Sequence, residues 1–522
     1  MTEASTLPAG MFALFAGALT IYIIVLYVIG FVAQRRVHNV EDFVLAGRRL
    51  PTSLATITII ATWFGAESLM TTADEVAAEG IRKAMLDPVG ISLCLFLAGM
   101  LIAGPMWRMK ILTVPDFFFR RYGKTAEILS SLIIVPSYFG WVAAQFVALA
   151  QLLEVFFGVP KEIGIIAVAT LGSGYTLLGG MWTITWTDAV QMGFILVGLV
   201  VLGYSILHHL GSGQLAEGAW HLRSGVPAER WRIADEPTFW RDTMVAVSAL
   251  AIGALGNLPM QDLMQRIFSA KSDKVAVKAC YFASAGYLLM GILPVGAGLS
   301  AMLLLPNQTG EIEGVVMLVA RELLNPVFLL IFFLAIVSAV LSTIVSAVMA
   351  PSAVMAHNLV EPSLQYFQAN QLSPHARLRL QRGAVVLVTA ASALLAFRGE
   401  GAYELVQGSY SMALVGLFVP FVVGIRVRRI PPLAAISAMV VGIGIWSLHL
   451  LMGWDYFCGP WLESRGFPIP HELAGVVGSF LGFVGGWAVA GAVDHNPDWH
   501  LAEEPSDLSP VVPVASEPAI VP

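Results

Sequence analysis

Two hydroxyl side chains in an apolar stretch near residue 340 have the spacing of a cation site. In SAVLSTIVSAVM, residues 338–349, Ala339, Ser342 and Thr343 stand at positions i, i+3 and i+4, so they share one face of a helix. A dehydrated monovalent cation takes about five oxygen ligands, which two hydroxyls and a few backbone carbonyls supply. The alternative is structural, because Ser and Thr in apolar helices commonly bond their own i−4 carbonyl or a neighbouring helix.

A second polar interruption lies in ATWFGAESLM, residues 61–70. Gly65 stands there among polar and aromatic residues, inside an otherwise apolar run: Thr62, Trp63, Glu67 and Ser68. An unwound backbone in a membrane leaves amides and carbonyls unpaired unless protein or a ligand satisfies them, so broken helices concentrate at substrate and ion sites. The alternative is close helix packing, for which membrane helices also use glycine.

The carboxylate of Glu67 predicts a function of its own, because an ionised group near the middle of a membrane is costly unless it is paired. A cationic or hydroxylated solute, or a proton, is a candidate partner. The structural alternative is a hydrogen bond to the unwound backbone or to a polar neighbour such as Asn257 or Gln261.

A matching interruption occurs in GALGNLPMQD, residues 253–262, where two glycines, Asn257 and Pro259 weaken another apolar run. The two interrupted runs are the second and the seventh along the chain, which favours two five-helix repeats that each begin with a broken helix. Because five is odd, the second repeat is inverted, and this arrangement is expected of an alternating-access transporter.

The composition shows what must position these residues. The 522 residues are 57% hydrophobic and 12% charged, which predicts an all-α polytopic membrane protein. Apolar runs predict about thirteen transmembrane helices. They lie near 11–33, 52–75, 88–107, 125–157, 161–178, 187–209, 240–264, 276–305, 322–357, 382–398, 404–425, 430–452 and 471–492.

The basic residues predict the orientation of these helices. Of the 29 Lys and Arg residues, 19 fall in alternate loops, in groups of four, five, four, three and three, and the third group includes Arg266. The positive-inside rule therefore favours an N-terminus outside the cell and a C-terminus inside. Residues 494–522 are rich in Pro, Ser and acidic residues and predict a disordered cytoplasmic tail without a signalling domain.

No pattern in the chain predicts catalysis. Cys94, Cys280 and Cys458 lie far apart in unlike segments, and His357 and His449 are isolated. No paired-carboxylate or Cys/His set is visible, so we expect that the chain is not an enzyme.

Four stretches resemble the sodium:solute symporter family, which includes the sodium/proline, sodium/glucose and high-affinity choline transporters. They are ATWFGAE (61–67), YTLLGGMWTITWTDAVQ (175–191), GNLPMQDLMQRIFSAKS (256–272) and AVLSTIVSAVMAPSAVMAHNLV (339–360), in family order and at family spacing. The resemblance implies a leucine-transporter-type core with an inverted five-plus-five repeat in the cell membrane. On this basis we expect an extra helix in 1–40, a core at 41–429 with repeats at about 52–209 and 240–425, extra helices in 430–493 and the tail at 494–522.

The resemblance also implies a sodium site, carried over position by position. Its ligands match the backbone carbonyls of Ala61 and Phe64 in the first broken helix. The remaining ligands match the carbonyl of Ala339 and the hydroxyls of Ser342 and Thr343. Gly65 would serve as the hinge beside this site.

The WTD motif implies that Asp188 lies at the cytoplasmic end of the sixth helix and assists sodium release. The alternative for Asp188 is a helix N-cap directly after Thr187. The chain lacks the acidic residue that the choline branch has after the two hydroxyls, and Val345 and Ser346 stand in this region instead. We therefore expect one sodium ion per cycle.

The solute is left open by the resemblance. Trp63 and Trp141 match aromatic residues of the quaternary-ammonium cage of the choline branch, but the third tryptophan matches Met260, which has no aromatic face. The candidate solutes are choline or betaine, an amino acid, a monocarboxylate, a sugar or a vitamin. The predicted solute-binding residues are Trp63, Glu67, Trp141, Asn257, Met260 and Gln261.

Together these observations predict sodium-coupled symport of a small organic solute into the cell by alternating access. A proton-coupled permease of the same fold is the alternative, and a transporter-like sensor ranks below it. The sequence does not indicate an oligomeric state.

Overall fold

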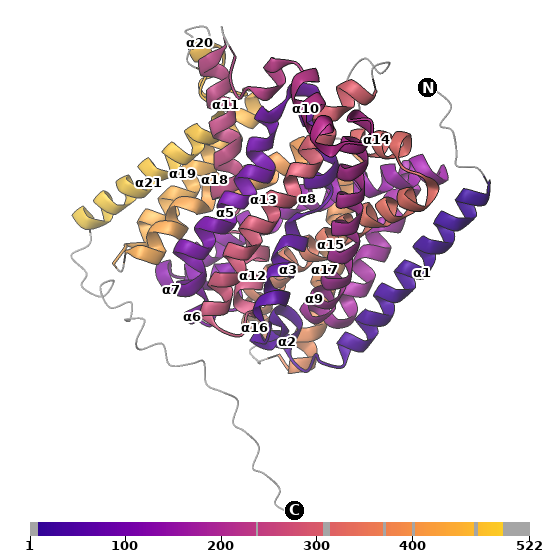
Figure 1. Cartoon of the computed structure of the whole chain (residues 1–522). Coiled ribbons are helices and arrows are strands. Elements are labelled where there is room, and N and C mark those ends of the chain that lie inside the picture. Colours follow the sequence, from indigo (N-terminus) through magenta and orange to yellow (C-terminus); the bar gives the residue numbers. More distant parts are fainter. Residues whose placement is uncertain are drawn as a thin grey trace, which may run out of the picture.

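A computed structural model describes residues 9–235, 238–305, 314–368, 372–398, 402–427, 429–463 and 468–493. Every regular element in these ranges is helical. Figure 1 shows a bundle of long helices with short helices gathered at its two ends. The labels α and η denote α-helices and short 3₁₀- or π-helical segments.

The first half of the chain contains α1 (Ala9–Gln34), α2 (Val40–Leu45), η1 (Ala46–Arg48), α3 (Thr52–Trp63), η2 (Glu67–Thr71), α4 (Thr72–Glu79), η3 (Ile81–Met85), η4 (Leu86–Gly90), α5 (Ile91–Leu97), η5 (Ala98–Ile102), α6 (Ala103–Arg108), α7 (Val114–Tyr122), α8 (Lys124–Phe157), α9 (Lys161–Leu210), α10 (Leu215–Gly225) and η6 (Ala228–Trp231). The second half contains α11 (Phe239–Ala251), η7 (Ile252–Gly256), α12 (Gln261–Ser269), α13 (Asp273–Leu304), α14 (Val315–Leu323), α15 (Pro326–Val354), η8 (Met355–Val360), α16 (Glu361–Gln368), α17 (Pro374–Ala396), α18 (Ala402–Arg426), α19 (Pro432–Met452), α20 (Pro460–Glu463) and α21 (His471–Val493).

The predicted number of thirteen membrane-spanning helices is not confirmed. Among the described residues, ten helices are long and apolar enough to span a membrane, or up to twelve if each of two bent pairs is one span. The difference lies in α9, a helical run of 50 residues that joins the predicted helices 161–178 and 187–209. Gly180 interrupts this run with a φ of 53° and a ψ of −133°, a conformation that glycine tolerates.

Both predicted helix breaks are confirmed. Thr52–Trp63 and Glu67–Glu79 meet at a bend of 65°, and Phe239–Gly256 and Gln261–Ser269 meet at a bend of 41°. The Leu50 amide donates a hydrogen bond to the Ser269 carbonyl (3.0 Å), and the Lys271 amide donates one to the Leu50 carbonyl (2.9 Å). The start of the first broken helix is thus tied to the end of the second.

The helix α15 lies at the centre of the bundle. All its side chains from Ala335 to Val354 are buried, and it packs against α3, α8, α9, α12 and α17. In contrast, α1 exposes apolar side chains such as Ile21, Ile24 and Val28. A large apolar outer surface is suited to lipid, so the chain is a multi-pass membrane protein.

The short helices mark the two ends of the bundle. In Figure 1, α2, α6, α7 and α16 lie at the lower end, whereas α10, α14 and α20 lie at the upper end. The lower end therefore carries segments that we predict to be cytoplasmic, and the upper end carries the long loop after α9, which we predict to be outside. The predicted tail, 494–522, lies outside the described residues.

The assignment of Arg266 to a loop is wrong. Arg266 lies in α12 and is fully buried, because its guanidinium donates hydrogen bonds to the carbonyl of Asp262 (3.2 Å) and to the hydroxyl of Ser346. Charge counting misplaced Arg266 because it does not consider that a buried guanidinium can be satisfied by hydrogen bonds inside the bundle.

Candidate functional site

The first helix break leaves backbone carbonyls without their usual partners. The Phe64 amide still bonds the Ile60 carbonyl (2.9 Å), but the next amide, of Gly65, bonds the Trp63 carbonyl (2.9 Å) and not the Ala61 carbonyl. Within the described chain, no hydrogen bond reaches the Phe64 carbonyl. The regular helix therefore ends at the two carbonyls predicted as cation ligands.

Gly65 brings this break into contact with α15. A Cβ atom at Gly65 would lie 2.4 Å from Thr343 Oγ1 and 2.8 Å from Thr343 Cβ. The same Cβ would lie 2.8 Å from Gln145 Oε1 on α8. Only glycine allows this approach, so three helices meet where the backbone of α3 is open.

The two hydroxyls on α15 have different partners. Ser342 Oγ donates a hydrogen bond to the Ala339 carbonyl (2.8 Å), as the structural alternative predicts. The Thr343 hydroxyl is fully buried, and the part of the chain that the structure describes offers it no hydrogen-bond partner. A buried hydroxyl without a partner is unfavourable unless a ligand satisfies it.

Glu67 has partners that differ from the predicted ones. Its carboxylate accepts hydrogen bonds from the indole of Trp141 (2.9 Å) and from the side-chain amide of Gln145, and Gln145 Oε1 accepts from the Ala66 amide (2.9 Å). The prediction that Asn257 or Gln261 forms a hydrogen bond with Glu67 is therefore wrong. The unwound backbone and the carboxylate are held together by α8.

A second buried carboxylate, Asp87 on η4, lies near this break. Asp87 Oδ2 accepts hydrogen bonds from Ser68 Oγ (2.6 Å) and from the Tyr287 hydroxyl (2.9 Å). The same Ser68 and Tyr287 oxygens also lie within hydrogen-bond distance of the Trp63 carbonyl (2.9 and 3.1 Å), so each single hydroxyl hydrogen is shared between two acceptors. Asp87 is thus joined to the break through two hydroxyls.

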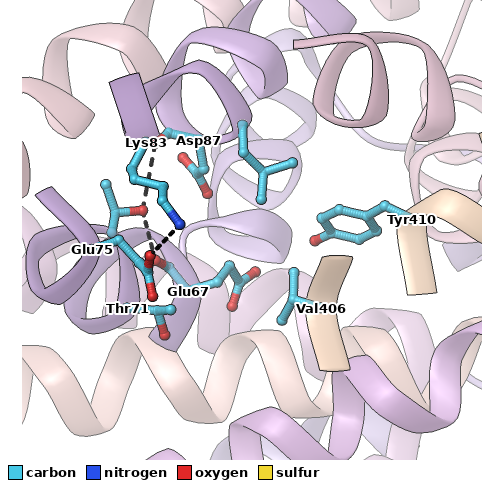
Figure 2. A pocket seen from close by; sticks show the side chains of 9 residues that line it. Glu67, Thr71, Glu75, Lys83, Asp87, Val406 and Tyr410 are labelled. Carbon is cyan, nitrogen blue, oxygen red and sulfur yellow. Dashed lines mark hydrogen bonds and ion pairs between the residues drawn. The ribbon is translucent and has the colours of Figure 1, made fainter. Parts of the chain in front are cut away.

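A cavity separates these carboxylates from α18. Its volume is about 20 Å³, room for about one water molecule in this conformation, and Figure 2 shows the side chains that line it. It is lined by Glu67, Thr71, Thr72, Glu75, Lys83, Leu86, Asp87, Val406 and Tyr410. Of the six predicted solute-binding residues, only Glu67 lines this cavity.

The other predicted solute-binding aromatic residues lie close by. Trp141 contacts Tyr410 with ring centroids 5.8 Å apart and also binds Glu67, so it forms a layer behind the cavity. The indole of Trp63 donates a hydrogen bond to Asp262 on α12, which also accepts one from the Tyr138 hydroxyl. The polar edge of Trp63 is therefore directed to the second broken helix.

The three predicted solute-binding residues at the second break do not line the cavity. Asn257 donates a hydrogen bond to the Gly253 carbonyl (3.0 Å) and is fully buried. Met260 is fully buried at the start of α12. The Gln261 side chain accepts a hydrogen bond from the Val114 amide (2.7 Å), at the end of the bundle that carries α7.

Asp188 lies within α9 and is fully buried. The alternative of a helix N-cap is wrong, because the helix continues through Thr187 and Asp188. Asp188 Oδ2 accepts a hydrogen bond from the Thr58 hydroxyl (2.5 Å), and its other oxygen lacks a partner in the described chain. It therefore connects α9 to α3 at Thr58, about one helical turn before Ala61, whose carbonyl is a predicted sodium ligand.

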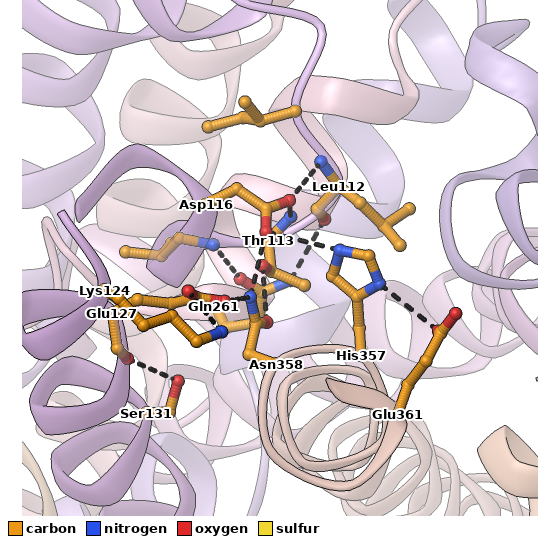
Figure 3. A network of polar contacts seen from close by, with 12 residues as sticks. Leu112, Thr113, Asp116, Lys124, Glu127, Ser131, Gln261, His357, Asn358 and Glu361 are labelled. Carbon is orange, nitrogen blue, oxygen red and sulfur yellow. Dashed lines mark hydrogen bonds and ion pairs between the residues drawn. The ribbon is translucent and has the colours of Figure 1, made fainter. Parts of the chain in front are cut away.

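A polar network closes the end of the bundle near α7 (Figure 3). Asp116 accepts hydrogen bonds from the Thr113 amide (3.0 Å) and from Asn358 (2.9 Å), and it lies 3.3 Å from the His357 imidazole. Although burial raises the pKa of Asp116, His357 and these hydrogen bonds hold that pKa well below its usual range. Asn358 also donates to Glu127 (3.0 Å), so the network joins α7, α8 and η8.

Several residues of these clusters were missed by the sequence analysis. Asp87 lies just before the run predicted at 88–107, Gln145 and Tyr410 lie within the runs at 125–157 and 404–425, and Asp262 ends the interruption at 253–262, but none of the four was singled out. The rule that isolated acidic residues in apolar runs are functional could have found Asp87 and Asp262. For Asp116, the capping-box spacing of Thr113 and Asp116 was a usable signal of a helix start.

The chain is similar in sequence to known transporters. A model of the sodium:solute symporter family matches residues 43–442. The chain is 26% identical to the human high affinity choline transporter 1 over 447 residues, which cover 82% of this chain and 75% of that protein. It is 25% identical to the sodium/proline symporter of Haemophilus influenzae over 443 residues, which cover 81% of this chain and 85% of that protein.

Solved structures show the same fold. A Na⁺-coupled sialic acid symporter in a substrate-bound outward-open state aligns with a TM-score of 0.72 and 18% identity, over 90% of this chain and 97% of that chain. MhsT in complex with L-phenylalanine aligns with a TM-score of 0.51 and 13% identity, over 83% and 98%. These likenesses support the predicted leucine-transporter-type fold. Because the family model covers well over half of the chain, the protein belongs to the sodium:solute symporter family.

Proposed function

We propose that the protein is a secondary active transporter that carries a small organic solute into the cell together with sodium, by alternating access. Family membership and the sodium-coupled relatives support the use of sodium as the coupling ion. The observation that carries the proposal is the fully buried Thr343 hydroxyl, which has no hydrogen-bond partner in the described chain and lies against Gly65 at the helix break.

The proposed sodium site consists of five oxygens without a formal charge. Ala61 and Phe64 supply carbonyls from the end of α3, and Ala339, Ser342 and Thr343 supply one carbonyl and two hydroxyls from α15. Hard oxygen ligands in this number suit a dehydrated monovalent cation. Ser342 Oγ donates its hydrogen to the Ala339 carbonyl, and its lone pairs would be available to the ion.

Sodium at this position would couple to the solute through the helix break. The ion would hold the end of α3 against α15, and the same break carries Glu67 toward the cavity. A ligand that binds one conformation better shifts the population toward it, so sodium would favour the conformation that binds solute. Movement of the repeats at about 52–209 and 240–425 would then expose the site to the other side.

Asp188 is placed to assist sodium release in this scheme. It is bonded to Thr58 on α3 and has one oxygen without a partner in the described chain, so it offers an anionic position beside the uncharged ligands of the proposed site. With the N-terminus outside, release would be toward the cytoplasm. Entry of one positive charge across 100 mV contributes about 2.3 kcal/mol to uptake.

The test is thermal unfolding of the purified protein in detergent, in sodium chloride and in potassium chloride of equal ionic strength. We would add choline, betaine, proline, short monocarboxylates, sugars, pantothenate and polyamines in turn. A ligand at about one hundred times its dissociation constant adds about 2.7 kcal/mol to stability. We expect sodium alone to stabilise the protein, and one solute class to add a further shift only in sodium.

The opposite result identifies the alternative. If sodium and potassium give equal melting temperatures with every solute, the sodium site is refuted. Solute shifts that then depend on pH, and not on the cation, would assign the protein as a proton-coupled permease.

A further inference from the structure

The walls of the cavity divide into an outer and an inner part. Glu75 and Lys83 form the outer part, and their side chains are 25% and 17% exposed. Glu67 and Asp87 form the inner part, and each is 6% exposed. Figure 2 shows the two inner carboxylates with Tyr410 across the cavity from Glu67. Because the inner carboxylates are the more buried, their charge and hydrogen bonds would have the larger effect on which solute binds.

The ammonium group of Lys83, in the outer part of the cavity wall, is already paired with carboxylates. Lys83 Nζ lies 2.8 Å from Glu75 and 3.1 Å from Glu79, so two carboxylates share this one ammonium group. Glu67 and Asp87, by contrast, are bonded only to neutral donors and form no ion pair with any described basic residue. Two carboxylates in one buried cavity favour a cationic occupant, because a buried negative charge without a positive partner is costly at low dielectric.

Two inner polar atoms have no partner. Asp87 Oδ1 and the Tyr410 hydroxyl are buried, and no other described group donates to or accepts from them. Asp87 Oδ1 can only accept when the carboxylate is ionised, so it calls for a donor on the occupant. The oxygens of Glu67 have further lone pairs for a second donor beyond Trp141 and Gln145.

The lining of the cavity suits an organic cation. Within the described chain, no group of three or more His, Cys, Asp or Glu side chains is arranged to hold a metal. The cavity instead combines the carboxylates with the ring of Tyr410, which packs on Trp141. An aromatic face attracts an organic cation, whereas the carboxylates select one that carries N–H groups.

We infer that the solute is a protonated amine that keeps at least one N–H group, bound between Glu67, Asp87 and Tyr410. This inference rests on the proposed function, because it names the solute class of the same transporter. A fully methylated ammonium group satisfies the charge but leaves Asp87 Oδ1 without a donor. The cavity therefore selects against a fully methylated ammonium head group at this position.

The test uses amines that differ only in methylation. Ethanolamine, its N-methyl and N,N-dimethyl derivatives and choline form one series, and 1,4-diaminobutane with its fully methylated form is a second. Dissociation constants are measured by thermal unfolding of the full chain in detergent, in sodium and in potassium. We expect weaker binding of the quaternary member by about tenfold or more, because a buried charged acceptor loses its donor.

Variants assign the effect to the cavity. Asp87→Asn should remove most of the preference for the unmethylated amine, and Tyr410→Leu, which removes the aromatic ring, should weaken every member of a series. Glu41→Gln is the matched control, because Glu41 pairs with Arg48 away from the cavity and should leave the preference unchanged. If Asp87→Asn does not fold, the methylation series on the wild-type protein still decides whether the N–H group is preferred.

The outcomes separate this inference from the sodium proposal. Unmethylated amines that bind equally well in sodium and potassium would support the amine class and refute sodium coupling. Choline that binds as well as ethanolamine, or no binding by either series while another solute shifts the melting temperature in sodium, would overturn the amine class alone. A preference that survives Asp87→Asn would also overturn it.

Discussion

The substitution Thr343→Val distinguishes a sodium ligand from a packing residue. Valine keeps the branched shape of threonine and replaces its hydroxyl by a methyl group of similar size. In the described chain this oxygen is fully buried and has no partner, so it lowers stability when no ion is bound. Its removal should therefore raise the free energy of unfolding in potassium, by about 1–3 kcal/mol.

In sodium the expected order is reversed. The wild-type protein should gain about 2.7 kcal/mol from sodium at one hundred times its dissociation constant, and the variant should lose this gain. Thr343→Val would then be more stable than the wild type in potassium and less stable, or equal, in sodium. Few packing effects produce such a crossing, because packing does not depend on which monovalent cation is present.

Thr185→Val is the matched control for this measurement. Thr185 is also fully buried in a helix, but its hydroxyl donates a hydrogen bond to the Met181 carbonyl (2.9 Å). Its loss should lower stability by about 1 kcal/mol equally in both salts. The assay is thermal or chemical unfolding in detergent across a sodium titration. A Thr343→Val variant that is destabilised in potassium and keeps the wild-type sodium shift would refute the reasoning.

Three further predictions concern the break, the cavity and the network at the α7 end. Gly65→Ala should lower stability by about 1–3 kcal/mol and abolish the sodium-dependent shift, because its Cβ would lie 2.4 Å from Thr343 Oγ1; a sodium titration of the melting temperature measures both. Glu67→Gln should weaken solute binding without removing the shift from sodium alone, and unchanged solute affinity and sodium dependence would exclude a solute contact. Asp116→Asn should lower stability at neutral pH, because His357 and hydrogen bonds hold the pKa of Asp116 below its usual range. This contribution is present above the unfolded-state pKa of about 4 and is lost as the pH falls through the lower folded-state pKa, so the melting temperatures of variant and wild type should converge below pH 4.

The sequence alone identified the features that depend on local chain chemistry. Long apolar runs predicted the helices, and Gly65, Asn257 and Pro259 predicted both breaks, because a bilayer penalises any unpaired backbone in a spanning segment. The resemblance predicted the family, which the family model confirms over residues 43–442. The count at α9 depends on Gly180, whose non-helical φ and ψ divide the 50-residue run between the predicted helices 161–178 and 187–209.

The tertiary structure decided which side chains meet. Glu67 is bonded by Gln145, 78 residues later along the chain, and the cavity brings it together with Asp87 and Tyr410. Gln261 was expected near the solute but binds the backbone at Val114, 147 residues earlier. Helical periodicity predicts which face of one helix a residue occupies, but the partner on that face depends on how helices distant in sequence pack and rotate against each other.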